Sequence, residues 1–278
     1  MSDWLYVTLL GIVQGLTEFL PVSSSGHLTL LNALFGFRDT DILSLVVVMH
    51  AGSLVAIVAV YLRELLKFLK PGRLRLLVML VLATIPAGVV GVAVHHFKWD
   101  ERFFGNLLCL GLSFLITGAV LRLTGCRKLT SVSDGEQGTE LANISWRQAL
   151  IIGLGQALII GLAQVVAIAP GISRSGSTIS AGVLCGVKRE AAATFSFLMA
   201  IPVIGGAVLV KLLGALRGGE SGIGVSWGVL VLGFAVSAAM SVGALLFLIR
   251  LVRRGKLYYF SWYMLALGAA VTLWQILK

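Results

Sequence analysis

Apolar residues fill most of this chain in long stretches, and short polar segments separate them. Six of these stretches approach or exceed the roughly 20 residues that a helix needs to cross a bilayer. Two further stretches, residues 1–41 and 146–187, are apolar but are each broken near the middle by polar residues. The pattern therefore predicts six membrane-spanning helices and two broken ones. The predicted spans are residues 42–62, 74–95, 104–124, 191–214, 226–250 and 258–277.

The distribution of basic residues predicts how these helices are oriented. Most of the 22 Lys and Arg residues fall in segments 63–75, 122–147, 188–189 and 250–256, which the positive-inside rule places in the cytoplasm. The first broken stretch must then begin and end outside, and the second must begin and end inside. Neither can cross, so each is expected to form a re-entrant pair of half-helices. These pairs are residues 5–19 with 26–36 and residues 146–168 with 177–187.

Two re-entrant pairs that enter from opposite faces define an inverted-topology repeat within one integral membrane domain, residues 1–278. The first repeat covers about residues 1–126, a polar linker about 127–145, and the second repeat about 146–278. Irregular backbone at membrane depth is tolerated only where protein buries it or where it lines a wet cavity. The tips of the two pairs are therefore expected to meet near the middle of the bilayer.

Composition supports an all-α membrane protein and argues against a nucleic-acid partner. Hydrophobic residues make up 58% of the 278 residues and charged residues 12%, which is about half the charged fraction of soluble domains. The net charge of +10 would suit nucleic acid, but the basic residues lie in short loops between predicted spans, where the positive-inside rule explains them. The expected partners are bilayer lipids, and a homodimer is left open.

Both breaks carry almost the same sequence. Residues 14–26 read QGLTEFLPVSSSG and residues 164–176 read QVVAIAPGISRSG. The two copies share a glutamine, two serines and a glycine at one constant offset, in the pairs Gln14 and Gln164, Ser23 and Ser173, Ser25 and Ser175, and Gly26 and Gly176. A duplicated polar loop in an apolar chain indicates a site at the junction of two repeats.

The first copy contains a carboxylate at predicted membrane depth. Gln14 and Glu18 are four residues apart, so they share one face of a half-helix. A charged side chain at that depth costs about 2.5–3.5 kcal/mol on insertion scales, so Glu18 needs a partner or a catalytic task. Ser24 and His27 are three apart at the start of the next half-helix, a spacing that could bring the imidazole near the hydroxyl. The alternative is that the serine-rich turn only caps the helix and that the histidine is a packed core residue.

The second copy adds a guanidinium to the expected site. The guanidinium of Arg174 can donate two parallel hydrogen bonds to a phosphate group. Two helix N-termini in one place would also attract an anion. Further hydroxyls and a glycine that permits close backbone approach are supplied by Ser173, Ser175, Thr178 and Gly176. The alternative for Arg174 is a structural salt bridge to Glu18, which would itself join the two loops. Together, the two copies predict a site for an anion, with phosphate as its occupant.

Other polar residues fit catalysis less well. His50 lies in the predicted span 42–62 and is expected to pack or to line a pore rather than to catalyse. The sequence has no P-loop, CxxC or HExxH motif, so nucleotide, redox and zinc-protease chemistry have no support.

These motifs resemble those of the bacitracin-resistance family of undecaprenyl-pyrophosphate phosphatases. The resemblance rests on the segments Gln14–His27 and Pro170–Thr178 and extends over essentially the whole chain. It implies a multi-pass protein of the bacterial cytoplasmic (inner) membrane that removes the terminal phosphate of a C55 polyprenyl pyrophosphate and returns the monophosphate carrier to cell-envelope synthesis. It also implies a divalent cation, Mg²⁺ or Ca²⁺, and an active site open toward the outer, periplasmic face.

The resemblance also implies roles for individual residues. Glu18 matches the family's essential acidic position and Gln14 a position that is Glu or Gln, so both are candidate metal ligands. Ser24 and His27 match the nucleophile and acid/base region. The phosphate-binding loop of the family corresponds to Ser173, Arg174 and Thr178. The candidate substrate-binding residues are Gln14, Ser23, Ser25, Gly26, Ser173, Ser175, Gly176 and Thr178.

The hypothesis from the sequence is a membrane phosphatase in which Arg174 clamps the phosphoryl group. A cation at Glu18, aided by Gln14, bridges pyrophosphate oxygens. The nucleophile is left open among Ser24, His27 and water. The competing class is a transporter or flippase of polyprenyl phosphate, because inverted repeats with broken helices are also the architecture of secondary carriers.

Overall fold

The computed structural model describes residues 3–35, 39–67, 74–97, 106–134, 153–216 and 226–278, and the elements in these ranges are helices. The helices are α1 (Asp3–Phe19), α2 (Ser24–Phe35), α3 (Asp39–Val60), α4 (Leu62–Lys67), α5 (Leu74–His96), α7 (Leu107–Leu123), α8 (Arg127–Asp134), α10 (Leu154–Val166), α11 (Arg174–Leu184), α12 (Arg189–Leu216), α13 (Trp227–Arg253) and α14 (Tyr259–Ile276). The predicted all-helical class is therefore confirmed.

Each predicted span coincides with one helix to within a few residues, and the six helices are α3, α5, α7, α12, α13 and α14. Within the described ranges, three segments are long and apolar enough to cross a membrane, namely Leu76–Val94, Arg189–Val210 and Trp227–Arg253. The start of the expected linker forms α8, whereas residues 135–145 of the linker and 146–152 of the third half-helix lie outside the described residues.

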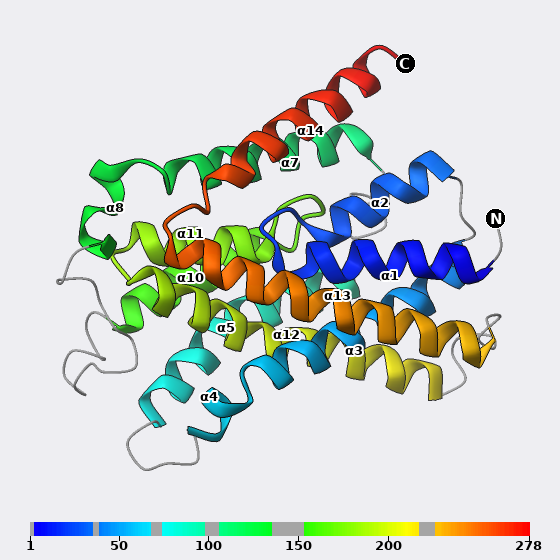
Figure 1. Ribbon diagram of the computed structural model, residues 1–278, viewed down its shortest axis with the longest axis horizontal. Helices are drawn as coiled ribbons and strands as arrows, with labels where there is room; N and C mark the ends of the chain where they lie inside the picture. The colour runs from blue at the N-terminus through cyan, green and yellow to red at the C-terminus, as the bar shows by residue number, and fades with distance from the viewer. Residues whose placement is uncertain (1–2, 36–38, 68–73, 98–105, 135–152, 217–225) are drawn as a thin grey trace.

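The two broken stretches form helical hairpins. Figure 1 shows the α1–α2 hairpin opening toward the end of the molecule that carries both chain termini, while the α10–α11 hairpin opens toward the opposite end. The loops between the paired helices lie near the centre of the molecule. Helices α2 and α11 begin at Ser24 and Arg174, two or three residues earlier than expected, because the serine just before each helix caps it.

Glycines let each hairpin lie close against a long helix. Helix α1 runs along α13, where a Cβ on Gly15 would come within 2.6 Å of the Ser237 carbonyl oxygen. Helix α10 runs along α5 in the same way, with Gly161 against the backbone of Ala83. Small residues at helix contacts are the usual means of close packing in membranes, where van der Waals contact replaces the hydrophobic driving force.

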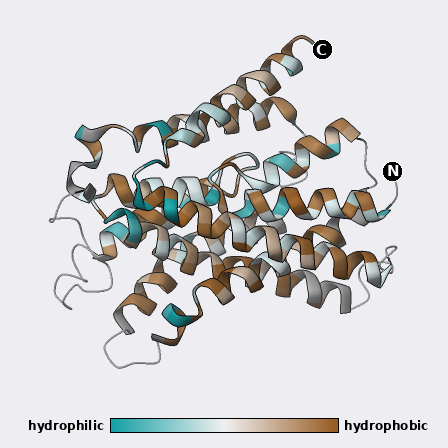
Figure 2. Cartoon of the chain, viewed as in Figure 1, coloured by the Kyte–Doolittle hydropathy of each residue, from teal (hydrophilic) through white to brown (hydrophobic). Residues whose placement is uncertain are grey.

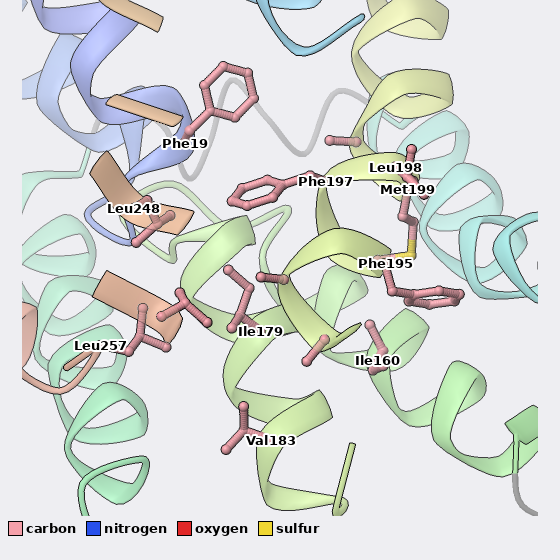
Figure 3. Close-up of a cluster of buried hydrophobic side chains, with 14 of the residues drawn as sticks. Phe19, Ile160, Ile179, Val183, Phe195, Phe197, Leu198, Met199, Leu248 and Leu257 are labelled. Carbon is pink, nitrogen blue, oxygen red and sulfur yellow. The ribbon is translucent and has the colours of Figure 1, made fainter. Parts of the chain in front are cut away.

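A buried apolar cluster holds the end of α1 against the second half of the chain. Phe19 has no exposed surface and packs edge-on against Phe197 of α12, with ring centroids 6.0 Å apart. Figure 3 shows Phe197 close to Ile179 of α11 and Leu248 of α13, so helices α1, α11, α12 and α13 meet at this point of the cluster. Because Phe19 directly follows Glu18, this packing fixes where the carboxylate lies.

The outer surfaces of the helices are apolar. Large side chains such as Val89, Val92 and Trp227 are mostly exposed. Figure 2 shows that hydrophobic residues dominate the helices and that hydrophilic residues are confined to short segments. Such a surface suits lipid rather than water as its surroundings. The chain is thus a multi-pass helical membrane protein.

Candidate active site

Both motif copies build the same helix start. The Oγ of Ser23 accepts a hydrogen bond from the backbone N–H of Gly26 at 3.3 Å, and the Oγ of Ser173 accepts one from Gly176 at 3.1 Å. A serine that accepts from the third residue of the helix is an N-cap. The capping interpretation is therefore confirmed for these two serines, and the residue after each cap becomes the first residue of α2 or α11.

The two loops reach this shared geometry by different backbone conformations. Ser23 has a φ of 68°, a left-handed conformation that non-glycine residues rarely adopt. In the second loop Gly171 takes the left-handed position, with a φ of 88°. Strained non-glycine residues of this kind cost roughly 1–3 kcal/mol and cluster at functional sites.

Direct contacts join the two loops to each other and to α7. Ser175 Oγ donates to the carbonyl oxygen of Leu20 at 3.1 Å, across the junction. Thr117 of α7 donates to the carbonyl oxygen of Gly171 at 3.1 Å and accepts from the backbone N–H of Ser173 at 3.2 Å. The expected meeting of the two tips is therefore observed, and Thr117, which the sequence did not single out, helps to fix it.

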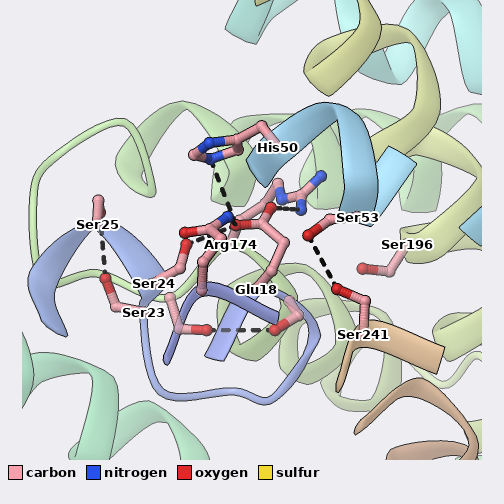
Figure 4. Close-up of polar contacts among 12 residues, drawn as sticks. Glu18, Ser23, Ser24, Ser25, His50, Ser53, Arg174, Ser196 and Ser241 are labelled. Carbon is pink, nitrogen blue, oxygen red and sulfur yellow. Dashed lines mark hydrogen bonds and ion pairs between the residues drawn. The ribbon is translucent and has the colours of Figure 1, made fainter. Parts of the chain in front are cut away.

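Glu18 is the centre of the polar contacts at this junction (Figure 4). Its Oε1 accepts from Nη2 of Arg174 at 2.6 Å. Its Oε2 accepts from Ser24 Oγ at 2.5 Å and from Gln14 Nε2 at 2.9 Å. His50 Nε2 lies 3.5 Å from the same Oε2 and forms an ion pair with it when the imidazole is protonated.

The ion pair between Glu18 and Arg174 is buried. Their side chains are 6% and 16% exposed, so each charge has lost most of its contact with water and depends on the other. The salt-bridge interpretation of Arg174 is therefore confirmed. The salt bridge uses only part of the guanidinium, because Arg174 Nη1 is buried without a hydrogen-bond partner. Gln14 Oε1 is likewise a buried acceptor without a hydrogen-bond partner. These two atoms are available to a ligand.

His27 does not pair with Ser24, contrary to what the three-residue spacing suggested. Its Nδ1 lies 2.8 Å from the carbonyl oxygen of Ser23, and its Nε2 lies 2.7 Å from the hydroxyl of Tyr263. Ser24 instead donates to Glu18, because α1 brings the carboxylate to the start of α2 while the imidazole turns toward α14.

Thr178 is also directed away from Glu18. It is fully buried, and its hydroxyl bonds to the carbonyl oxygen of Arg174 at 2.7 Å and to Ser196 Oγ of α12 at 2.5 Å. The observed contacts therefore make Thr178 a support for Arg174. The remaining hydroxyl candidates pair with each other, since Ser23 and Ser25 lie 3.4 Å apart and Ser173 and Ser175 lie 3.3 Å apart.

A buried serine cluster lies beside the site on helices α3 and α13. Ser53 Oγ lies 2.9 Å from Ser241 Oγ and 3.2 Å from Ser237 Oγ. Ser237 donates to the carbonyl oxygen of Met49, and Ser241 donates to that of Gly15. The cluster links α1, α3 and α13 one helical turn from Gln14 and His50. Sequence reasoning missed it, and it also undervalued His50, whose only signal was a histidine in an apolar span.

Among the described residues, no group of three or more His, Cys, Asp or Glu side chains could hold a metal ion by itself. Glu18 nevertheless offers a carboxylate, and the unpaired Gln14 Oε1 offers a carbonyl oxygen beside it. Mg²⁺ typically takes one or two protein carboxylates and completes its shell with water and substrate phosphate oxygens. The residues present fit a cation that is held jointly with a phosphate ligand.

This fold and this site define a class of protein, a multi-pass membrane protein with a buried acid–arginine site between two polar loops. The family described as bacitracin resistance protein BacA matches residues 7–270. An undecaprenyl-diphosphatase from Desulfatibacillum aliphaticivorans is 36% identical over 96% of this chain and 97% of its own. Relatives of the same name from Rhodopirellula baltica and Bacteroides thetaiotaomicron are 38% and 35% identical, with at least 98% of both chains covered. The chain belongs to the BacA family, which confirms the resemblance found in its sequence.

Proposed function

We propose that the chain is an undecaprenyl-diphosphatase, which hydrolyses undecaprenyl pyrophosphate to undecaprenyl phosphate and orthophosphate and so recycles the lipid carrier for envelope synthesis. The observation that carries the proposal is the carboxylate of Glu18, which Arg174 and Ser24 contact at the junction of two helix N-termini. Family membership and the names of the relatives support the same activity.

Arg174 binds the terminal phosphoryl group in this proposal. Its Nη1 supports that role, because this donor is buried at the site without a hydrogen-bond partner. Phosphate can therefore bind it without breaking an existing hydrogen bond. The N-termini of α2 and α11 add partial positive charge from two directions. The same arrangement stabilises the extra negative charge that develops on the phosphoryl oxygens during transfer.

Ser24 is the nucleophile that the contacts favour. Its hydroxyl already donates to Glu18 at 2.5 Å, so the carboxylate can take the proton as Oγ attacks the terminal phosphorus. The new Oγ–P bond replaces the anhydride bond, and Glu18 passes the proton to the departing lipid phosphate. If water is the nucleophile instead, the same carboxylate would deprotonate it, and Ser24 would only orient it.

His27 serves the second half of the proposed reaction. A water molecule must then break the phosphoserine bond, and its proton needs an acceptor. His27 lies one helical turn after Ser24, and its Nε2 accepts a hydrogen bond. It takes the proton from water and returns it to Ser24 Oγ as orthophosphate leaves. His27 as the nucleophile is less favoured, since both of its nitrogens bond away from Glu18.

A divalent cation is also part of the proposal. Glu18 and Gln14 Oε1 would hold it together with oxygens of the substrate. Mg²⁺ or Ca²⁺ bound there would neutralise pyrophosphate charge.

The membrane arrangement proposed is six spanning helices in two inverted repeats, with the site open to the periplasmic side of the inner membrane. The matched pairs α1 with α13 and α10 with α5 support the repeat. Arg122, Arg250 and Arg253 lie in the last turns of α7 and α13, at the end toward which the α10–α11 hairpin opens (Figure 1). The positive-inside rule makes that end cytoplasmic, so the α1–α2 hairpin would open outward.

The test is orthophosphate release from C55 pyrophosphate by purified protein in detergent. Glu18→Gln should lower turnover by about 10²–10⁴-fold, the usual contribution of an acid–base residue. Glu190→Gln is the matched control, because Glu190 forms an exposed ion pair with Arg253 away from the site, and it should keep wild-type turnover. Wild-type turnover by Glu18→Gln would exclude the assigned role.

The opposed hairpins in Figure 1 also suit a carrier, so the transporter remains the second candidate. Liposomes that report lipid translocation and orthophosphate separately distinguish the two functions. Phosphate release without translocation supports the phosphatase, whereas translocation by protein that releases no phosphate supports the carrier.

A further inference from the structure

Two side chains from different helices hold the ring of His27. The Tyr263 ring of α14 stacks on it, with centroids 5.8 Å apart and planes inclined by 11°. Phe114 of α7 packs on it at 5.6 Å. The Tyr263 hydroxyl lies 2.7 Å from Nε2, and this contact joins residues that are far apart in the sequence. The imidazole therefore has one orientation, and α14 sets it.

The hydrogen bonds also select one tautomer. Nδ1 faces the carbonyl oxygen of Ser23 at 2.8 Å, and a carbonyl oxygen can only accept, so Nδ1 carries the hydrogen. In the neutral ring Nε2 is then the acceptor. The Tyr263 hydroxyl is consequently the donor, and because it occupies the single lone pair of Nε2, a proton from water reaches this nitrogen through the hydroxyl.

Tyr263 lies on the more open side of this pair. Tyr263 is 47% exposed, whereas Ser23, on the other nitrogen of the imidazole, is buried. A tyrosine that merely anchored α14 at the membrane boundary would not need a histidine partner from another helix.

We propose that Tyr263 is a further residue of the active site, which holds His27 in one orientation and tautomer and passes the proton to it. The Tyr263 hydroxyl gives its hydrogen to Nε2 of His27 as its oxygen takes the proton of the attacking water. The inference rests on the acid–base role of His27 given under the proposed function. It follows the general pattern in which a third group orients a catalytic base. Neither motif copy contains this residue, so α14 completes a site that the two loops begin.

A double-mutant cycle tests the proposal with Tyr263→Phe, His27→Ala and the combination. Tyr263→Phe should lower kcat about 10- to 100-fold with little change in KM, because a misplaced base slows chemistry more than binding. In the His27→Ala background the same change should have no further effect. Tyr259→Phe is the matched control on the same helix, one turn away and also half-exposed, and it should retain wild-type kinetics.

Three outcomes would overturn the proposal. The first is a Tyr263→Phe enzyme whose kcat stays within about twofold of the wild type. The second is a double variant in which the kcat losses of the two single variants multiply. The third is a fully active His27→Ala enzyme. The last would remove the role of His27 while leaving pyrophosphate hydrolysis intact, so failure of the inference is distinguishable from failure of the function. Ring ¹⁵N shifts give a readout besides activity, with His27 protonated at Nδ1 in the wild type and a mixture of tautomers in Tyr263→Phe.

Discussion

Ser24 and Arg174 occupy the same position in the two motif copies and bind different oxygens of one carboxylate. Ser24 Oγ lies 2.5 Å from Oε2 of Glu18, and Arg174 Nη2 lies 2.6 Å from Oε1. Each is the first residue of its helix and follows a serine that precedes the helix. The duplicated loop therefore brings a hydroxyl from one copy and a cation from the other to the same acid. Divergence at this position, together with Ile168 where the first copy has Glu18, makes an asymmetric site from two similar loops.

Ser24→Ala should reduce turnover by about 10²–10⁴-fold if Ser24 is the nucleophile, since Glu18 would lose the group that it activates. The wild-type enzyme should then release a burst of undecaprenyl phosphate, about one per enzyme, before steady turnover, and Ser24→Ala should show none. Rapid-quench measurements of both products check this. Turnover of Ser24→Ala within about tenfold of the wild type would favour water as the nucleophile.

Arg174→Ala should unfold more easily as well as lose activity. Removing one partner of a buried ion pair costs about 3–5 kcal/mol, because the other charge stays buried and unpaired. The double variant Glu18→Gln with Arg174→Met removes both charges and should regain most of the stability but none of the activity. Thermal unfolding in detergent and orthophosphate release measure the two effects separately.

The control for this pair is Arg253→Ala, which breaks an exposed ion pair with Glu190. Exposed pairs contribute at most about 1 kcal/mol, so this variant should unfold near the wild-type temperature. If the double variant proved as unstable as Arg174→Ala, the buried ion pair would not be the source of the lost stability.

Gly15→Ala should impair the enzyme although no catalytic group changes. The added Cβ would meet the Ser237 carbonyl oxygen at 2.6 Å and Met240 Cβ at 2.7 Å, so α1 must move away from α13 and carry Glu18 with it. A displacement of about 1 Å can cost about 10²-fold in rate. Gly243→Ala on α13 is the control, since nothing lies within 4 Å of its added Cβ. It should keep full activity, and equal losses in both variants would contradict the packing argument.

The helices and the main contact of the site were predictable from the sequence because their causes are local. Long apolar stretches predict helices directly, and a duplicated motif with one acid and one arginine predicts that these charges meet. The helix starts were placed two or three residues too late, because the sequence offers several serines as caps and does not show that Ser23 and Ser173 are the ones that cap.

The parts that could not be predicted depend on contacts between distant segments. Nothing near Tyr263 in the sequence distinguishes it from the neighbouring Tyr259, and only the packing of α14 brings it to His27. His50 similarly looks like a core histidine until α3 is placed against Glu18. The expected contact between Ser24 and His27 was wrong for the same reason, because spacing along one helix ignores the carboxylate that α1 supplies.

Gln14→Glu tests where the cation binds. Gln14 now donates Nε2 to Glu18 and leaves Oε1 unpaired. A carboxylate in its place would lose that donor and put two like charges side by side, an arrangement that a divalent cation relieves. The variant should therefore need several-fold less Mg²⁺ for half-maximal orthophosphate release, and chelator should inhibit both enzymes. An unchanged or higher Mg²⁺ requirement would place the cation away from Gln14 and Glu18.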